Sequence, residues 1–521
     1  MNTAEFLTIS AAVVPDREAL VCGESRIDYA GMQSRVNQLA NALQSMGIER
    51  GAAVAVMAVN CPQYVEAYYA CAKAGAVFVP LNYRAKREEL EYMLNASETQ
   101  ALFVGGRYLD LVAGLKPQLE KVREFVCLDS KAGGMRSYDE LLAGAPDDEL
   151  FVDIDENDAS ILMYTSGTTA QPKGVVLTFL TLSVYVTNTM APADPKAERD
   201  VTLVSVPFYH VAGATAMMSS IWGGRTLAIL PQFEPEAWLE TVQRERVTHA
   251  FVVPTMLKRI MEHPRFDQYD ISSLKLITYG AAPMPYEVVR KAVDVFRCGL
   301  MNAYGQTEST STLTYLGPDD HQIPKGDGPE RESKLRRLRS VGRAMDDVVI
   351  AIMDEKNDVL PPGEEGEICV AGARVMREYH KQADATAAAI IDGWLHTGDV
   401  GYLDGNGYLF ITGRKKDLII RGGENISSGE IEDVIDAHPK VDESAVIGVP
   451  DAEWGEVVKA IVVPNPGERP TAAEIIAYCK ERLASYKAPA YVALVDELPR
   501  NPLGKVLKTE LRKLHGQPDN N

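Results

Sequence analysis

Short apolar runs alternate with longer amphipathic stretches along this chain, and that alternation limits its fold more than any other feature. Residues 52–59 predict a buried strand, residues 63–74 a helix with a face of small residues, and residues 76–80 the next strand. The same succession returns with a helix over 233–246 and a strand over 250–253. Repeated strand–helix–strand units favour an α/β fold in which helices cover largely parallel sheets.

The chain has 521 residues, which is too long for one hydrophobic core, so we expect two or more domains. From residue 348 the predicted strands become shorter and are separated by turn signals at 361–363 and 404–407, which indicates a smaller β-rich unit. After Gly413 the charge density rises, and a compact α+β pattern runs to the end. We therefore place a domain boundary after residue 413.

The polar segment 317–339 has little periodicity and carries several basic residues. It predicts a mobile surface loop, and a lid or a phosphate-facing segment is the alternative.

The composition is that of a large globular protein, with 46% apolar and 24% charged residues. A net charge of −20 argues against binding to nucleic acid and against electrostatic docking on anionic lipid. The seven cysteines are scattered and form no Cys-x-x-Cys pair, which favours reduced thiols, no zinc site and a cytoplasmic location. The chain shows no signal-peptide pattern and no apolar run long enough for a transmembrane segment.

A polar loop at residues 164–174 lies between the apolar runs 161–163 and 175–177, so it predicts strand, exposed loop, strand. Its hydroxyl groups, glycines and Lys173 can surround an anion, and phosphate is the expected ligand. An ordinary hairpin loop is the alternative. The loop differs from a Walker motif because Lys173 follows a proline and precedes a glycine.

The run Ser166-Gly-Thr-Thr-Ala-Gln-Pro-Lys-Gly174 resembles the signature loop of the adenylate-forming superfamily. That superfamily includes acyl-CoA synthetases, peptide-synthetase adenylation domains and luciferases of the firefly type. One departure is Ala170, which stands where the family has glycine and which resists a positive φ. The resemblance implies that ATP phosphates bind the following loop residues: Thr165, Ser166, Gly167, Thr168, Thr169 and Lys173.

A second stretch, residues 302–308, is similar to another core motif of the family. The ring of Tyr304 can stack on adenine, and the carboxylate of Glu308 can hold Mg²⁺ against the phosphates, together with Thr165. Other residues of this nucleotide site are implied to be Asn302, Ala303, Gly305 and Thr307. The small residues Gly280, Ala281 and Ala282 follow a predicted strand and leave room for a flat ring.

The resemblance also implies that Asp399 and Arg414 contact the ribose, because a carboxylate can accept hydrogen bonds from two neighbouring hydroxyl groups. His210 corresponds to a family position next to the acid substrate, although a lone histidine is more often structural. The small residues Ala212, Gly213 and Ala216 follow it and are expected at the wall of an acyl pocket.

The last motifs lie in the C-terminal part. The resemblance makes 414–417 a hinge centred on Lys416, with 1–413 as the large domain and 418–521 as a small mobile α+β domain. Gly422 and Gly423 then belong to the strand that approaches the pantetheine arm of CoA. Lys505 matches the family's catalytic lysine, whose ammonium would stabilise charge between the substrate carboxylate and the α-phosphate.

Together these motifs predict an ATP-dependent ligase that converts an apolar carboxylic acid, fatty or aryl, into an acyl-adenylate and then an acyl-CoA. ATP, Mg²⁺ and CoA are the expected cofactors and substrates. The enzymatic alternatives are an enzyme that loads a carrier protein and a luciferase-like oxygenase, and the non-enzymatic alternative is an acyl- or nucleotide-binding scaffold. Dinucleotide, zinc-peptidase and serine-hydrolase motifs are missing from the chain. The oligomeric state stays open, with a homodimer among the states considered.

Overall fold

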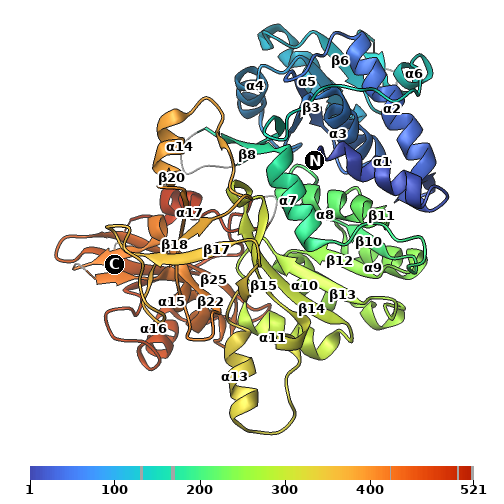
Figure 1. Cartoon of the computed structure of the whole chain (residues 1–521). Helices are drawn as coiled ribbons and strands as arrows, with labels where there is room; N and C mark the ends of the chain where they lie inside the picture. The colour runs from blue at the N-terminus through green and yellow to red at the C-terminus, as the bar shows by residue number, and fades with distance from the viewer. Residues whose placement is uncertain (130–132, 166–170, 423, 502–503, 518–521) are drawn as a thin grey trace.

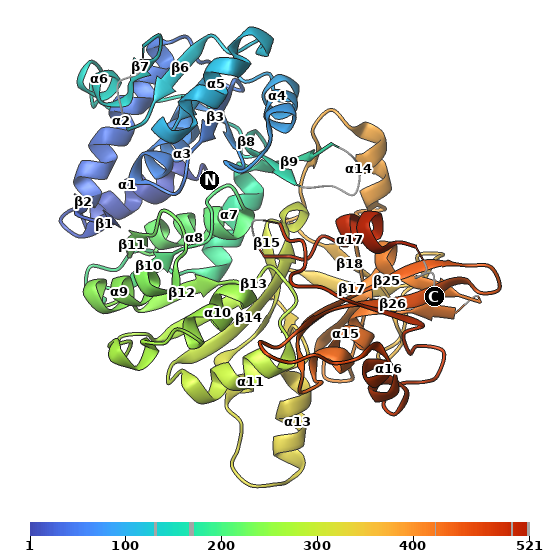
Figure 2. The same cartoon turned by 180° about the vertical axis from the view of Figure 1, so that it is seen from behind.

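The computed structural model describes residues 1–129, 133–165, 171–422, 424–501 and 504–517. Two large sheets form most of the N-terminal part, and two smaller sheets follow towards the C-terminus (Figure 1). Both views place helices α1 (Ala4–Val13), α3 (Pro62–Ala74), α7 (Phe179–Thr189) and α8 (Val211–Trp222) between the two large sheets (Figure 2). Apolar side chains from both sheets and from these helices form one continuous core.

The larger sheet is parallel in its middle and antiparallel at its edges, in the order β16-β15-β14-β13-β12-β10-β11-β1-β2. Its strands are β1 (Glu18–Cys22), β2 (Ser25–Asp28), β10 (Val201–Val204), β11 (Thr226–Ile229), β12 (His249–Val252), β13 (Leu276–Gly280), β14 (Gly299–Gln306), β15 (Ser311–Leu316) and β16 (Arg343–Ala344).

The second large sheet has the order β19-β9-β8-β4-β3-β5-β6-β7 and is parallel except for the β8, β9 and β19 edge. Its strands are β3 (Ala53–Met57), β4 (Val77–Pro80), β5 (Ala101–Val104), β6 (Glu124–Cys127), β7 (Arg136–Ser137), β8 (Ala159–Thr165), β9 (Lys173–Thr178) and β19 (Glu378–Tyr379).

The remaining helices cover the outer faces and connect the strands. They are α2 (Tyr29–Ser45), α4 (Arg87–Ala96), α5 (Leu109–Leu115), α6 (Tyr138–Ala143), α9 (Pro235–Glu245), α10 (Pro254–Met261), α11 (Tyr286–Val295), α12 (Pro318–His321), α13 (Pro329–Arg337), α14 (Ala383–Ala389), α15 (Ser428–Asp436), α16 (Ala472–Lys480) and α17 (Lys508–His515). Single 3₁₀ turns are η1 (Gly106–Tyr108), η2 (Lys116–Gln118), η3 (Phe266–Gln268), η4 (Thr307–Ser309) and η5 (Lys415–Asp417). Among the described residues, no helix is both long and apolar enough to cross a bilayer.

The third sheet joins β17 (Val349–Met353), β18 (Gly366–Ala371), β20 (Ile390–Ile391), β21 (Trp394–Leu403) and β22 (Leu409–Arg414). The fourth joins β23 (Ile419–Arg421), β24 (Glu424–Ile426), β25 (Val441–Asp451), β26 (Gly455–Pro464) and β27 (Tyr491–Leu494). Apolar clusters lie on both faces of the fourth sheet: α15 and α16 contribute Ile431 and Ile475 to one, and α17 contributes Leu511 to the other. The strands after residue 348 are not shorter than the earlier ones, since β21 and β25 span 10 and 11 residues, so that part of the prediction is wrong. The segment does form a small sheet of its own, as the turn signals indicated.

The expected loop at 317–339 contains two helices, α12 and α13, so that part of the prediction is wrong. None of the residues of α13 is buried, and the helix projects from the molecule in Figures 1 and 2. A helix without buried residues needs no continuous apolar stripe, and periodicity therefore could not reveal it. Pairing between Arg337 and Asp320, 3.4 Å apart, holds its last turn against α12.

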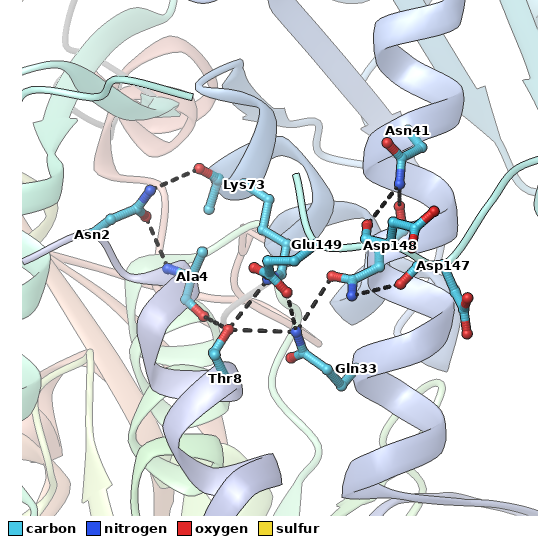
Figure 3. Close-up of polar contacts among 11 residues, drawn as sticks. Asn2, Ala4, Thr8, Gln33, Asn41, Lys73, Asp147, Asp148 and Glu149 are labelled. Atoms are coloured by element: carbon cyan, nitrogen blue, oxygen red, sulfur yellow. Dashed lines mark hydrogen bonds and ion pairs between the residues drawn. The ribbon is translucent and has the colours of Figure 1, made fainter. Parts of the chain in front are cut away.

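Polar contacts fasten the irregular segment 146–149 onto the first helices (Figure 3). Asn41 of α2 donates to the backbone oxygens of Pro146 and Asp148, at 3.1 and 2.9 Å. Lys73 of α3 is almost fully buried and forms an ion pair with Glu149. The segment thereby satisfies its own carbonyl groups and supplies the charge that the buried lysine requires.

A second buried charge joins three helices. Glu66 of α3 is 0% exposed, and its two oxygens accept from Arg35 of α2 at 2.6 and 3.1 Å. Tyr138 at the start of α6 also donates to Glu66. A carboxylate this deep is stable only while its partners stay in place.

Replacing Arg35 with leucine should lower the free energy of unfolding by about 3–5 kcal/mol, because Glu66 would stay buried without its cation. Urea unfolding followed by circular dichroism measures the loss. The matched control is Arg136→Leu, which breaks a 2.7 Å pair with Glu124 in which the arginine is 53% exposed. That change should cost about 1 kcal/mol or less. Equal losses in the two variants would contradict the assignment.

Candidate active site

The predicted phosphate loop is the connection between two paired strands. β8 ends at Thr165 and β9 begins at Lys173, and these two residues are partners in the antiparallel register. The Thr165 hydroxyl lies 3.5 Å from the Lys173 carbonyl oxygen. The strand–loop–strand prediction is therefore confirmed, while Ser166, Gly167, Thr168 and Thr169 lie outside the described residues.

Lys173 and Glu308 come together through a residue that the sequence analysis did not single out. Tyr379 of β19 donates from its hydroxyl to Glu308 Oε1 at 2.9 Å. The Lys173 ammonium lies 4.6 Å from the centroid of the same ring. Nothing in the local sequence around Tyr379 marks it as functional; only the pairing of β19 with β9 brings it here.

The chain turns tightly where β13 and β14 end. A Cβ on Gly280 would lie 2.1 Å from the Ala303 carbonyl oxygen, and one on Gly305 would lie 1.7 Å from that of Ser311. Glycine is thus required at both positions by close backbone approach. Ala281 follows at φ 65°, a conformation that costs an alanine free energy and that concentrates at functional sites. The neighbouring predicted residues are the partly exposed Ala282 and Thr307 and the buried Asn302.

Asp399 connects this edge to the third sheet. It is 4% exposed, and its two oxygens accept from Tyr304 Oη at 2.8 Å and from Arg414 Nε at 2.7 Å. Arg414 is the register partner of Asp399 across β21 and β22. The structure thereby brings together three residues that were predicted for the nucleotide.

Glu367 holds the turn that precedes Asp399. It accepts from the Gly398 N–H at 3.1 Å, and its other oxygen lies 3.0 Å from His396 Nδ1 and 3.1 Å from Lys415 Nζ. One partly buried carboxylate thus links the Asp399 turn to η5, which lies in the predicted hinge. Arg512 of α17 contacts the other end of η5 by pairing with Asp417 at 2.9 Å.

Lys505, from the C-terminal part of the chain, lies near enough to this site for the charges of Arg414 and Asp399 to act on its ammonium. Burial lowers the pKa of its ammonium to about 8; the charge of Arg414 acts in the same direction, and Asp399 partly opposes it. The preceding Gly504 has φ +77°, and a Cβ there would lie 2.6 Å from Thr255 Oγ1 of α10. Gly504 therefore packs directly against α10.

Lys416, the predicted hinge residue, lies in η5 beside this group, and burial lowers the pKa of its ammonium. Gly422 lies apart from it: its N–H donates to the Trp454 carbonyl at 2.8 Å, within the fourth sheet. Its φ of +58° explains the glycine. Gly423 lies outside the described residues.

His210 is the residue before α8, and burial lowers the pKa of its imidazole to about 3. It is therefore neutral at physiological pH. Its Nε2 is buried and has no hydrogen-bond partner among the described residues. Ala212 and Ala216 lie four residues apart on one partly exposed face of α8.

Gly213 does not fit the expected pocket wall. It is buried, and a Cβ there would lie 2.3 Å from the Pro207 carbonyl oxygen. Its small size serves the close packing of α8 on the preceding turn, so a larger residue at 213 would test folding and not pocket width.

The pKa of Lys505 predicts how activity depends on pH. Above about pH 8 the free enzyme loses this ammonium, so kcat/KM for ATP in adenylate formation should fall as the pH rises through that value. Pyrophosphate release measured across the transition tests this. In Lys505→Arg the guanidinium stays charged, and the fall should disappear even if the rate is lower. A fall that is the same in both proteins would assign the titration to another group.

Comparisons with known proteins identify the family of this chain. The family model described as "AMP-binding enzyme" matches residues 7–380, and "AMP-binding enzyme C-terminal domain" matches residues 430–505. A feruloyl-CoA synthase from Amycolatopsis sp. is 37% identical and covers 97% of each chain. The long-chain-fatty-acid–CoA ligase FadD13 of Mycobacterium tuberculosis is 34% identical and covers 98% of each chain.

Among solved structures, ATP-bound MatB from Rhodopseudomonas palustris has a TM-score of 0.87 at 30% identity, over 99% of each chain. The family models together cover both the sheets that hold the Lys173–Glu308 group and the part that carries Lys505. The chain therefore belongs to the AMP-binding enzymes of the adenylate-forming superfamily and is an ATP-dependent acyl-CoA synthetase.

Proposed function

We propose that the enzyme activates an apolar carboxylic acid in two steps, with the residues described above in separate roles. The observation that supports this most directly is the contact of Asp399 with both Arg414 and Tyr304, together with the effect of the Arg414 and Asp399 charges on the Lys505 ammonium. A lysine held beside a ribose-binding pair lies where negative charge develops during adenylate formation.

In the first step, an oxygen of the substrate carboxylate forms a bond to the α-phosphorus of ATP, and the bond to pyrophosphate breaks. Lys173 and the loop that precedes it hold the phosphates. Tyr304 and the small residues after β13 receive the adenine, while Asp399 binds the ribose hydroxyls. Lys505 offsets the charge that grows between the carboxylate and the α-phosphate.

The oxygen atoms of Glu308 and Thr165 suit Mg²⁺, which prefers hard oxygen ligands. Glu308 and Thr165 would hold the ion, which would supply positive charge to the ATP phosphates. Glu308 Oε1 already accepts from Tyr379, and the second carboxylate oxygen is the one we assign to the cation.

In the second step, residues 418–521 rotate as a domain about the hinge 414–417 and withdraw Lys505. The strand that carries Gly422 and Gly423 then approaches the site with the pantetheine arm. The CoA sulfur forms a bond to the acyl carbon, and AMP leaves with the electron pair of the anhydride bond.

The acid-binding side is apolar. Ala212 and Ala216 present a small, uncharged face of α8, and the unpartnered Nε2 of the neutral His210 can hydrogen-bond the substrate carboxylate. Two classes of acid are candidates for this enzyme. Similarity to the feruloyl-CoA synthase supports an aryl acid, and similarity to the long-chain-fatty-acid–CoA ligase supports a long-chain fatty acid.

A panel of acids distinguishes these classes. Ferulate and related aryl acids, and a straight-chain series, are assayed for pyrophosphate release with and without CoA. Release that rises when CoA is added, with formation of the acyl-CoA, supports the proposal. Release without any thioester would favour transfer to a carrier protein, and light emission with luciferin would favour an oxygenase.

Replacing Ala216 with leucine should shift the preference towards shorter or narrower acids. Each methylene excluded from the pocket is worth about 1–3 kcal/mol of discrimination. The test is kcat/KM across the acid series, and KM for ATP in the same variant serves as the control and should barely change. An unchanged acid profile would place the acyl pocket away from this face of α8.

The partners that we propose are the acid, ATP and CoA. We propose the cytoplasm as the location of the enzyme. A homodimer is the assembly to test, by light scattering on the purified protein.

A further inference from the structure

The segment around Tyr379 is held by its backbone between two parts of the active site. Tyr379 is the register partner of Val175, and the His380 N–H donates to the Gly174 carbonyl at 2.7 Å. On the other side, the Met376 N–H donates to the Glu308 carbonyl at 2.7 Å. These bonds do not involve the tyrosine side chain, which can therefore be changed without releasing the segment.

The Tyr379 side chain lies between two opposite charges. Its hydroxyl donates to Glu308 Oε1 at 2.9 Å, and its ring lies under the Lys173 ammonium at 4.6 Å. The residue is 8% exposed, so water reaches this contact poorly. A cation over an aromatic face and a hydroxyl on a carboxylate are each favourable in such surroundings.

This arrangement prevents a competing interaction. A lysine and a glutamate that approach within about 4 Å attract each other strongly where water is scarce. Within the described residues, no ion pair joins Lys173 to Glu308; the tyrosine takes both groups as partners instead. Direct pairing would neutralise the two charges that the phosphates and a cation need.

We propose that Tyr379 is a positioning residue for adenylate formation: it keeps Lys173 and Glu308 apart and directs the second oxygen of Glu308 towards the cation. The inference rests on the roles proposed above for those two residues. It assigns to Tyr379 no contact with the reacting atoms.

Two variants separate the hydroxyl from the ring. Tyr379→Phe keeps the ring under Lys173 and removes the bond to Glu308. We expect kcat/KM for ATP to fall about ten- to a hundred-fold and the Mg²⁺ concentration for half-maximal adenylate formation to rise, with KM for the acid unchanged. Tyr379→Leu removes both contacts and lets Lys173 pair with Glu308. KM for ATP should therefore be higher in Tyr379→Leu than in Tyr379→Phe.

Tyr408→Phe is the matched control, because that hydroxyl also donates to a carboxylate at 2.9 Å, on Asp320, outside the site. Its kinetics should equal those of the wild type. A double-mutant cycle with Glu308→Gln tests whether the hydroxyl acts through Glu308. We expect Tyr379→Phe to have little further effect when Glu308 is already replaced.

Two results would overturn the inference alone: an unchanged Mg²⁺ dependence in Tyr379→Phe, or fully additive effects in the double-mutant cycle. In both cases the wild type would still form the adenylate, so the proposed function would stand. A wild type that releases no pyrophosphate with any acid would overturn the proposed function and the inference with it.

Discussion

Replacing Lys505 with alanine should slow acyl-adenylate formation by about 10²–10³-fold while the conversion of supplied acyl-adenylate to acyl-CoA stays nearly unchanged. In this structure the charges of Arg414 and Asp399 act on the ammonium, and the second step that we propose withdraws it. Its interaction is strongest when negative charge develops on the carboxylate and the α-phosphate. Loss of that interaction therefore lowers the rate of one half-reaction only.

The two half-reactions are measured separately, as pyrophosphate release in single turnover and as thioester formation from the synthetic adenylate. Lys513→Ala is the control, because that lysine belongs to the neighbouring α17 and is 71% exposed. It should leave both rates unchanged. Equal losses of both half-reactions in Lys505→Ala would indicate a folding defect and remove the support for a catalytic role.

Replacing Lys416 with proline should have the opposite effect, with adenylate formation retained and CoA transfer reduced by about 10²-fold, as expected when reacting groups are displaced. Lys416 lies in η5, a single 3₁₀ turn that connects β22 of the third sheet to β23 of the fourth. The φ of a 3₁₀ turn is close to the value that proline imposes, so the present conformation tolerates the change. A hinge with φ held there cannot adopt a second backbone state.

Lys416→Ala is the control for the lost side chain, because alanine keeps the freedom of φ. If Lys416→Pro makes acyl-CoA at the wild-type rate, residue 416 is not the hinge. If it loses adenylate formation as well, the proline disturbs the present conformation and the rotation proposal loses this support.

Features that depend on neighbouring residues could be predicted from the sequence. The β8–β9 connection, the strand before Gly280 and the helix that starts at Pro235 each carry their signals within a short window. Apolar periodicity and turn residues act over one or two turns of chain. The exposed helix α13 has no such periodicity, and the prediction failed there for that reason.

The local sequence was enough to predict the alternation of strands and helices, the β8–β9 hairpin and the small β-rich unit after residue 348. Three features could be seen only from tertiary contacts: Tyr379 contacts both Lys173 and Glu308, the buried Glu66 pairs with Arg35, and Gly213 packs on Pro207. The physical reason is that strand register and packing join residues far apart in the chain, through contacts that leave no periodic pattern in the local sequence.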